Sequence, residues 1–399
     1  MAKSSYKNML NPRRGFMIEK AQPFTKQDIE LVRQILKEND EVVIGIGDAG
    51  ASHDKRIVMT AGERIEVADA VLQDAGISPE NYVLLPVENA PEHVQWVAEV
   101  MMVTPRWQIF YTRNFKNASM FASFQQHYGY KIKTIGQQNQ DADYFELMGR
   151  WLRGDALARE ELNLYLTEAA LLKMKELGIL NRVDVIYNRR NLIPQPQKKS
   201  NRALFLGGFQ PFTGVFKLQN GHFSVVQKAL TEKKQIVIAV GSAQHSHKVN
   251  DPLSAGRRIE VIRYALLQNR IPASRFFLIP IKDIQANAGY APKVVSFCPA
   301  FDAVLAGNDW TKQLFGEGKY EIIALERTAA QGTPLSATKV RSIVTDYIQK
   351  NHIKEEPVSE RTVKQIEHAL GNMLDPATMK ILKEIGFYDT MHFLAFAKE

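Results

Sequence analysis

An internal repeat constrains the fold of this sequence more than any other feature. Residues 43–47 (VIGIG) are answered by residues 237–241 (VIAVG), and residues 61–66 (AGERIE) by residues 255–260 (AGRRIE), both pairs 194 positions apart. Upstream, the tripeptide QPF recurs at an offset of 188, so the second copy carries six extra residues just after it. Self-similarity that holds its register over this distance predicts two tandem copies of one domain.

Each copy alternates short apolar segments with apolar-periodic segments, which is typical of parallel strands joined by helical crossovers. In the second copy, strands are predicted at residues 203–206, 235–240, 276–280 and 301–305. One helix is predicted over residues 222–230. A second helix, capped by Ser254, is predicted to continue to about residue 268. The expected fold class is α/β, with two tandem Rossmann-like, doubly wound parallel-sheet domains and C-terminal helices.

The chain is expected to divide at a polar, proline-punctuated segment between the copies. The closing helices of the first copy are expected over residues 160–177, and further helices over residues 359–370 and 376–385. The predicted parts are a polar tail (1–14), a first α/β domain (15–188), a linker (189–202), a second α/β domain (203–352) and a helical extension (353–399).

Composition is that of ordinary globular material: 45% of the 399 residues are hydrophobic and 24% are charged. No apolar run approaches the roughly 18 residues of a membrane span, and one cysteine, Cys298, excludes an internal disulfide and suits a reducing compartment. We therefore expect a cytoplasmic protein with no membrane partner, and we expect Cys298 to be a small buried hydrophobe. Homo-oligomer formation is left open.

The formal net charge of +8 suits a polyanionic partner without choosing one. The basic doublets carry no interleaved aromatic residues of the kind that stack single-stranded bases, so nucleic acid is disfavoured. We expect a solvated surface position for all three doublets, which are Arg13-Arg14, Arg189-Arg190 and Lys198-Lys199.

The first candidate element for phosphate chemistry follows the first strand of the second copy. That strand ends in the run GGFQPF (residues 207–212), and a helix then opens with Gly221-His222. In an open parallel sheet, ligands lie beyond the carboxyl ends of the strands, where the backbone N–H groups of helix starts attract phosphate. A histidine in the first helical turn can stabilise the charge that develops in transfer, although Gly-His alone is also a common surface pair.

The second element is residues 334–341 (PLSATKVR), where Ser336 or Thr338 can begin a helix. Hydroxyl and N–H groups there would face an anion, and Arg341, about one turn later, would add charge-assisted hydrogen bonds. By itself this string is more often a helix cap with a surface arginine. Its pairing with a Gly-His turn in one α/β domain is more specific.

This pair of motifs resembles the nucleotidylyltransferase superfamily, which has an HxGH turn after its first strand and an SxTxxR helix start near the domain's end. The corresponding residues are 219–222 (QNGH) and 336–341. Residues 241–247, 255–260 and 279–288 are similar to signatures of the archaeal-type nicotinamide-nucleotide (NMN) adenylyltransferases. The resemblance covers residues 203–347. It implies transfer of AMP from ATP to NMN, giving NAD and pyrophosphate with Mg²⁺.

The resemblance also implies a role for each candidate residue, and it implies no metal-ligating side chain. Such chemistry needs positioning and charge stabilisation more than acid-base groups, because the incoming phosphate is already a nucleophile. The residues expected around the ATP phosphates are His222, Gln219, Ser336, Thr338 and Arg341. Those expected to form the nucleotide-binding turns are Gly207, Gly208, Phe209, Gln210, Gly221, Gly241 and Ser242. Those expected near the nicotinamide are Asp283, Ile284, Asn287, Tyr290 and Asn308, and a core position explains Tyr290 nearly as well as stacking.

The second copy departs from the family pattern at four places. Gly208 and Asn250 replace arginines, Gln219 replaces the first motif histidine, and residues 213–218 are inserted in the ATP-binding turn. Each lost charged contact weakens phosphate stabilisation by about 1–3 kcal/mol.

The first copy lacks both motifs: its turn reads TKQD (residues 25–28), and Asp28 would repel phosphate. Yet Trp96 keeps the stacking position, Arg56 the pocket arginine and residues 111–114 the strand-end pattern. Core packing explains Trp96 adequately, and a retained ligand pocket is a further hypothesis.

Three functions therefore compete. The first is an NMN adenylyltransferase that binds ATP and NMN or NAD in its second copy. The second is a non-catalytic nucleotide-binding or NAD-binding sensor or scaffold descended from that enzyme. The third, nucleic-acid binding, rests on net charge alone and requires a steep salt dependence.

Overall fold

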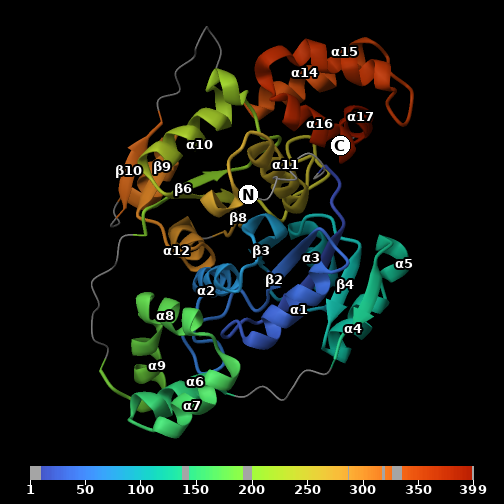
Figure 1. Ribbon diagram of the computed structural model, residues 1–399. Helices are drawn as coiled ribbons and strands as arrows, with labels where there is room; N and C mark the ends of the chain where they lie inside the picture. The colour runs from blue at the N-terminus through green and yellow to red at the C-terminus, as the bar shows by residue number, and fades with distance from the viewer. Residues whose placement is uncertain are drawn as a thin grey trace.

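The chain folds around two parallel β-sheets (Figure 1). The computed structural model describes residues 10–136, 143–191, 200–285, 287–316, 320–325 and 335–397. Within that part of the chain each sheet has five strands. The first is ordered β3-β2-β1-β4-β5, with β1 (Arg14–Glu19), β2 (Glu41–Ile46), β3 (Tyr82–Pro86), β4 (Ile109–Thr112) and β5 (Lys131–Thr134). The second has the equivalent order β8-β7-β6-β9-β10, with β6 (Arg202–Gly207), β7 (Gln235–Val240), β8 (Phe276–Pro280), β9 (Ala303–Ala306) and β10 (Glu321–Ala324).

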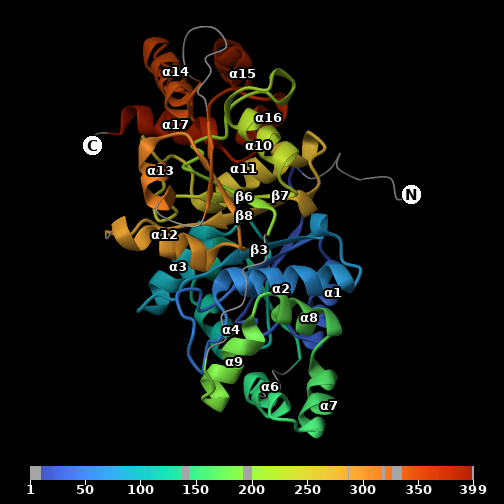
Figure 2. The same ribbon diagram turned by 90° about the vertical axis from the view of Figure 1, so that its left-hand side faces the viewer.

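Helices cover each sheet, and a group of four closes each domain. The first domain has α1 (Lys26–Leu36), α2 (Ala61–Asp74), α3 (His93–Val103), α4 (Phe115–Ala122) and α5 (Gln125–Tyr128), followed by α6 (Tyr144–Leu152), α7 (Ala156–Tyr165), α8 (Glu168–Glu176) and α9 (Ile179–Asn188). The second has α10 (Gly221–Glu232), α11 (Ala255–Gln268), α12 (Asn287–Phe297) and α13 (Asp309–Gly316), followed by α14 (Ala337–Lys350), α15 (Glu360–Leu370), α16 (Pro376–Glu384) and α17 (Phe387–Phe396). The groups α6–α9 and α14–α17 lie at opposite ends of the molecule in both views (Figures 1 and 2).

The predicted fold class is confirmed, and most differences lie at element ends. Strand β9 begins two residues later than predicted, at Ala303. The helix expected over residues 160–177 is interrupted, because Thr167 caps a new helix by accepting a hydrogen bond from the Ala170 N–H. Ser254 caps α11 as expected, and Ser359, the first residue of the predicted range 359–370, caps α15. In the described residues, no helix has the length and apolar character that crossing a bilayer requires.

Loop geometry repeats between the domains at the offsets seen in the sequence. The left-handed backbone positions Ala21 and Asp48 correspond to Phe209 and Ser242. The side-chain amide of Gln22 pairs with the backbone of Met59, and Gln210 makes the same two bonds with Leu253. The domains are therefore equivalent in their loops as well as in strand order.

The domains pack edge to edge, with β3 against β8, α2 against α12 and α11 against α3 (Figure 2). A Cβ atom on Gly62 would lie 1.9 Å from the carbonyl oxygen of Cys298, and one on Gly256 would lie 1.8 Å from that of Thr104. Each domain thus places its motif glycine against the backbone of the other. Cys298 is buried, as predicted, and its burial raises the pKa of the thiol.

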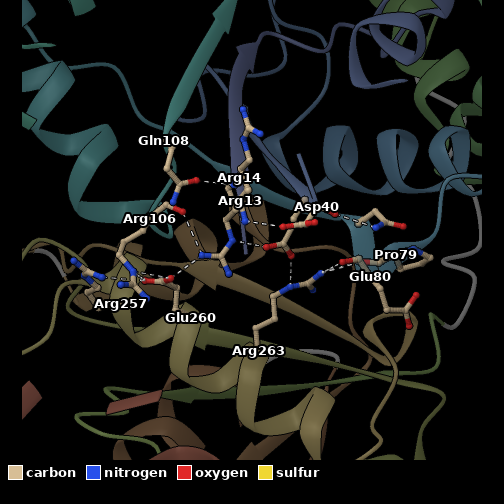
Figure 3. Close-up of polar contacts among 12 residues, drawn as sticks. Arg13, Arg14, Asp40, Pro79, Glu80, Arg106, Gln108, Arg257, Glu260 and Arg263 are labelled. Carbon is tan, nitrogen blue, oxygen red and sulfur yellow. Dashed lines mark hydrogen bonds and ion pairs between the residues drawn. The ribbon is translucent and has the colours of Figure 1, made fainter. Parts of the chain in front are cut away.

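A buried ion-pair network crosses the same interface (Figure 3). Arg14 pairs with Glu41 of its own domain and, at 2.6 Å, with Glu260 on α11 of the other. Arg263 on α11 pairs with Glu41 at 2.6 Å, and Arg106 with Glu260 at 3.1 Å. The prediction of a solvated Arg14 is therefore wrong, because its side chain is only 7% exposed.

The other basic doublets differ in what the structure shows. Arg189 and Arg190 are exposed, as expected. Lys198 and Lys199 lie outside the described residues.

On the opposite side of the interface, Arg202 reaches Glu66 at 2.7 Å, a pair equivalent to Arg14 and Glu260.

Candidate functional site

The candidate site lies at the carboxyl edge of the second sheet, where β6 and β7 end. The Gly241 N–H donates to the carbonyl of Gly207 at 2.9 Å, so the two strand ends stay joined. Helix α10 starts nearby, and its N-cap Asn220 makes no side-chain capping bond. No side chain therefore caps the first turn of α10, although the His222 N–H already donates to the Thr213 carbonyl at 3.0 Å. The remaining first-turn N–H groups are the ones that an anion at a helix start would use.

His222 lies in this first turn and is neutral. The Thr213 N–H donates to its Nδ1 at 2.8 Å, and the ring stacks on Phe212 with centroids 5.2 Å apart. Burial lowers the pKa of His222 to about 4. Because Nδ1 accepts a hydrogen bond, the neutral ring carries its proton on Nε2. His222 can thus donate from Nε2 to a phosphoryl oxygen.

Arg341 joins the two predicted motifs across 131 residues of sequence. Its Nη1 donates to the carbonyl of Gln210 at 2.6 Å, and its Nη2 lies 3.3 Å from Thr338 Oγ1. Ser336 caps α14 by accepting from the Lys339 N–H at 3.2 Å. Leu335 contacts the start of α10, since a Cβ on Gly221 would lie 2.9 Å from its Cδ2. The structure therefore brings both helix starts to one place.

Arg258 is a second guanidinium at this edge. It is fully buried and donates to the carbonyls of Gly208, Gly241 and Ser242 at 2.8, 2.7 and 3.1 Å. Burial lowers its pKa to about 10, so it stays charged at neutral pH. Arg258 ties the two strand-end loops together from beneath.

The inserted residues 213–218 contact the C-terminal helical extension. Gly214 forms a parallel β-bridge with Leu374, and its N–H donates to the carbonyl of Met373 at 2.8 Å. The Phe216 N–H donates to Oδ2 of the buried Asp375 at 3.2 Å. Because Thr213 begins the insertion and holds His222, the extension supports the candidate site.

Other residues predicted for the ATP-binding turn differ in their exposure. Gln219 is exposed and has a left-handed backbone. Gly208 leaves open space, since nothing lies within 4 Å of where its Cβ would be. Gln210 is buried with both amide atoms bonded to Leu253, and Phe209 is buried with its ring 5.0 Å from that of His222. The side chains of Gln210 and Phe209 thus shape the turn from inside.

The residues predicted for the nicotinamide surround the ends of β7, β8 and β9. Asp283 accepts from the Ser242 N–H at 3.3 Å and from the Gln244 amide at 3.1 Å. Tyr290 is buried, with its ring 5.4 Å from that of Trp310. Ile284 is partly buried, and the side chain of Asn287 is outside the described residues. Asn308 caps α13 by accepting from the Thr311 N–H at 2.8 Å.

Sequence reasoning missed three residues at this site. Arg258 had a signal, because an arginine recurs at the same place in both AGxRIE motifs. Trp310, 44% exposed and beside Tyr290, lies two residues after the predicted Asn308. Asp375 had no local signal, since only the tertiary fold brings it to the insertion.

The equivalent edge of the first domain has different chemistry. Asp28 takes the position of His222, and it forms a capping box with Thr25 at the start of α1. Arg113 pairs with Asp28 and, at 2.9 Å, with Glu19. A carboxylate and a closed helix start thus replace the open turn of the second domain.

The described residues hold no group of three histidine, cysteine or acidic side chains that could bind a metal ion. Mg²⁺ usually keeps several waters and binds substrate phosphates through them. In the described part of the chain, the side chains therefore do not form a resident metal cage.

Comparison with known proteins matches the second domain to a known family. Residues 204–359 match the family described as cytidylyltransferase-like. A nicotinamide-nucleotide adenylyltransferase of Thermococcus kodakarensis is 34% identical over 168 residues, which cover 42% of this chain and 85% of that protein. The protein of the same name from Methanococcus aeolicus is 36% identical over 152 residues, covering 38% of this chain and 82% of that protein.

A solved structure, a bifunctional NMN adenylyltransferase/ADP ribose pyrophosphatase from Francisella tularensis, is 16% identical and superposes with a TM-score of 0.31. The superposed part spans 47% of this chain and 54% of that structure's chain. The fold and the family match define a nucleotidyltransferase of the cytidylyltransferase-like class. The chain belongs to the nicotinamide-nucleotide adenylyltransferase family through its C-terminal part.

Proposed function

We propose that the second domain transfers AMP from ATP to NMN, giving NAD and pyrophosphate. The observation that carries this proposal is the hydrogen bond from Arg341 to the Gln210 carbonyl, 2.6 Å long, which joins both phosphate motifs beside the neutral His222. A phosphate oxygen of NMN attacks the α-phosphorus of ATP. The bond from that phosphorus to the β-phosphate oxygen breaks, and pyrophosphate leaves with the electron pair.

The chain's contribution is positioning and charge stabilisation. His222 donates from Nε2 to a phosphoryl oxygen, and Arg341 places a positive charge at the same turn. Arg258 holds the carbonyls of Gly208 and Gly241, so that the strand-end loops keep their spacing. Mg²⁺ enters as part of the substrate MgATP and neutralises the phosphates. Asp283 and Tyr290 lie on the acceptor side, with Trp310 as the exposed aromatic surface.

The test is NAD formation from ATP, MgCl₂ and NMN by the full chain. We expect product from the wild-type chain and a loss of about 100-fold or more in His222→Ala, as for removal of one transition-state donor. His368→Ala, an exposed histidine on α15, is the matched control and should leave turnover unchanged. Equal turnover in wild type and His222→Ala would refute the proposed role of His222.

A non-catalytic nucleotide sensor is the second candidate. It is supported by the open space at Gly208 and by the exposed Gln219, which replace charged family residues. It predicts that NAD or its precursors bind in calorimetry while no NAD forms at high protein concentration. Product formation above background excludes it.

We further propose that the two domains arose by tandem duplication, as supported by their equal strand order and by the loop contacts at constant offsets. The first domain then acts as a structural or regulatory partner, because its helix start is closed by Asp28. We also propose a cytoplasmic location, which the single buried thiol of Cys298 supports. Fractionation of cells that express the chain at its natural level tests that location.

A further inference from the structure

The first domain contains a cavity that the catalytic proposal does not use. It has a volume of about 810 Å³ and lies at the carboxyl ends of β1, β2 and β4. The strand order reverses between β1 and β4, which is where open parallel sheets bind ligands. Ligand sites typically measure about 300–1,000 Å³. Position and size therefore fit a nucleotide-sized molecule.

The buried side of this cavity is acidic. Asp28 is 5% exposed, and the side chain of Glu19 is 17% exposed. Burial lowers the pKa of Arg113, but Glu19 and Asp28 outweigh it and raise the pKa above its usual value. Arg113 thus stays charged and neutralises one of the two carboxylates. A triphosphate on this side would add negative charge beside a net negative cluster and a capped helix start.

The exposed side of the same cavity is basic. Lys55, Arg56 and Lys116 line it and are exposed, and they outnumber the one exposed carboxylate there, Asp143. The Arg56 side chain is 89% exposed, and the nearest carboxylate oxygen, on Asp54, is 3.9 Å away. The guanidinium is thus available for a bidentate bond to a single phosphate.

Apolar side chains also line this cavity. Trp96 and Met120 line the cavity, and both are only partly buried. The Trp96 ring meets Phe121 edge to face, with centroids 5.6 Å apart. A planar base can pack against such a surface. The carboxylates inside can accept hydrogen bonds from ribose hydroxyls, as acidic residues do in dinucleotide sites.

We infer that this cavity binds a nucleoside monophosphate, with its sugar toward Glu19 and Asp28, its base against Trp96 and its phosphate on Arg56. The site is separate from the proposed catalytic edge, since the two occupy different sheets. The inference holds whether or not the second domain is active. The proposed ligand has one phosphate, because a polyphosphate that extended from Arg56 toward Glu19 and Asp28 would meet net negative charge.

The experiment measures binding stoichiometry by calorimetry on the full chain carrying His222→Ala, with NMN, AMP and ATP each used alone. We expect NMN or AMP to occupy one site that is weakened about tenfold or more by Arg56→Ala and by Trp96→Phe. Lys37→Ala, an exposed cation outside the cavity, is the matched control and leaves that affinity unchanged. Comparison of NMN with AMP shows which base the site accepts.

Two results would overturn the inference. One is that neither monophosphate binds, or that each binds with an affinity that Arg56→Ala leaves unchanged. The other is that ATP binds the site and Arg56→Ala weakens ATP as much as it weakens the monophosphates. Arg56 is exposed, so its removal does not threaten folding. Turnover plays no part in the readout, so an inactive second domain and an empty first-domain cavity are separate outcomes.

Discussion

Arg14, the first residue of β1, donates from Nη1 to Oε1 of Glu260 on α11 across 2.6 Å. The two residues are 246 positions apart and belong to different domains. Glu260 lies two residues from Arg258, the guanidinium that holds the carbonyls at the candidate site. One face of α11 thus contacts the first domain while another supports the phosphate turn.

Arg14→Ala should destabilise the whole chain. Its removal leaves Glu41 and Glu260 buried with one fewer cation each, and breaking a buried pair typically costs about 3–5 kcal/mol. The free energy of unfolding in urea measures the effect. Arg33→Ala, which removes an exposed pair with Glu30 at 2.6 Å, is the control and should change little. An equal, small effect of both variants would contradict a stabilising network.

Acid should weaken the contribution of this network. Burial raises the pKa of Glu41, but Arg263 and Arg14 outweigh it and hold the pKa below its usual value of 4.5. A depressed carboxyl pKa stabilises the fold above the unfolded pKa, and the gain is lost as pH falls through the folded pKa. The difference in unfolding free energy between wild type and Glu41→Gln should therefore be constant near pH 7 and shrink below about pH 4.5. A difference that does not change with pH would exclude this linkage.

His222 should show the titration of a buried neutral base. Its pKa is lowered to about 4 by burial, whereas an unfolded histidine titrates near 6.5. Between these values the unfolded chain binds the extra proton, so stability falls as pH drops from about 6.5 to about 4. His222→Asn should lack this component of the pH dependence. Titration of His222 should not lower the rate of NAD formation between pH 6 and 8. A fall in that rate with a midpoint near pH 6.5 that is absent in His222→Asn would contradict a neutral donor.

Gly256→Ala should disturb the domain interface. The added Cβ would lie 1.8 Å from the Thr104 carbonyl oxygen, so the domains must shift, and such overpacking typically costs about 1–3 kcal/mol. Gly62→Ala, on the equivalent contact, should behave alike. Gly50→Ala is the control, since nothing lies within 4 Å of its Cβ position. Thermal unfolding compares the stability of these variants. If Gly256→Ala is as stable as Gly50→Ala, the interface can shift to accept the added Cβ without a cost in stability.

Asp375→Ala should reduce turnover as well as stability, because the buried Asp375 also caps α16. Asp375 accepts from the Phe216 N–H in the insertion and, at 3.3 Å, from the Asn269 amide. Without it the insertion loses one anchor, and Thr213 holds His222 less firmly. We expect kcat to fall about tenfold or more, in line with the effect of small misplacements at a reacting centre. The exposed Asp346→Asn is the control, and unchanged kcat in Asp375→Ala would show that the extension does not support the turn.

Much of the architecture follows from local signals. The repeated strand and motif segments predict two doubly wound sheets, because strands and helices are read from hydrophobic period alone. Ser254 is predicted as a helix cap, and Ser336 is one of two residues predicted to begin a helix, since a capping hydroxyl bonds a backbone N–H three residues later; both caps are present in the structure. The pairing of His222 and Arg341 in one site followed from the motif resemblance, and the structure places both at the β6 turn.

What the sequence determined by itself was therefore the fold class, several helix starts and the family, because each rests on short segments that can be recognised from their own residues. Only the tertiary structure decided that Arg14 is buried, that Gly256 contacts Thr104, and that the insertion rests on Asp375. These contacts join residues more than 100 positions apart. Burial and charge pairing depend on which surfaces of the two domains and the helical extension pack together, and short sequence patterns do not specify that packing.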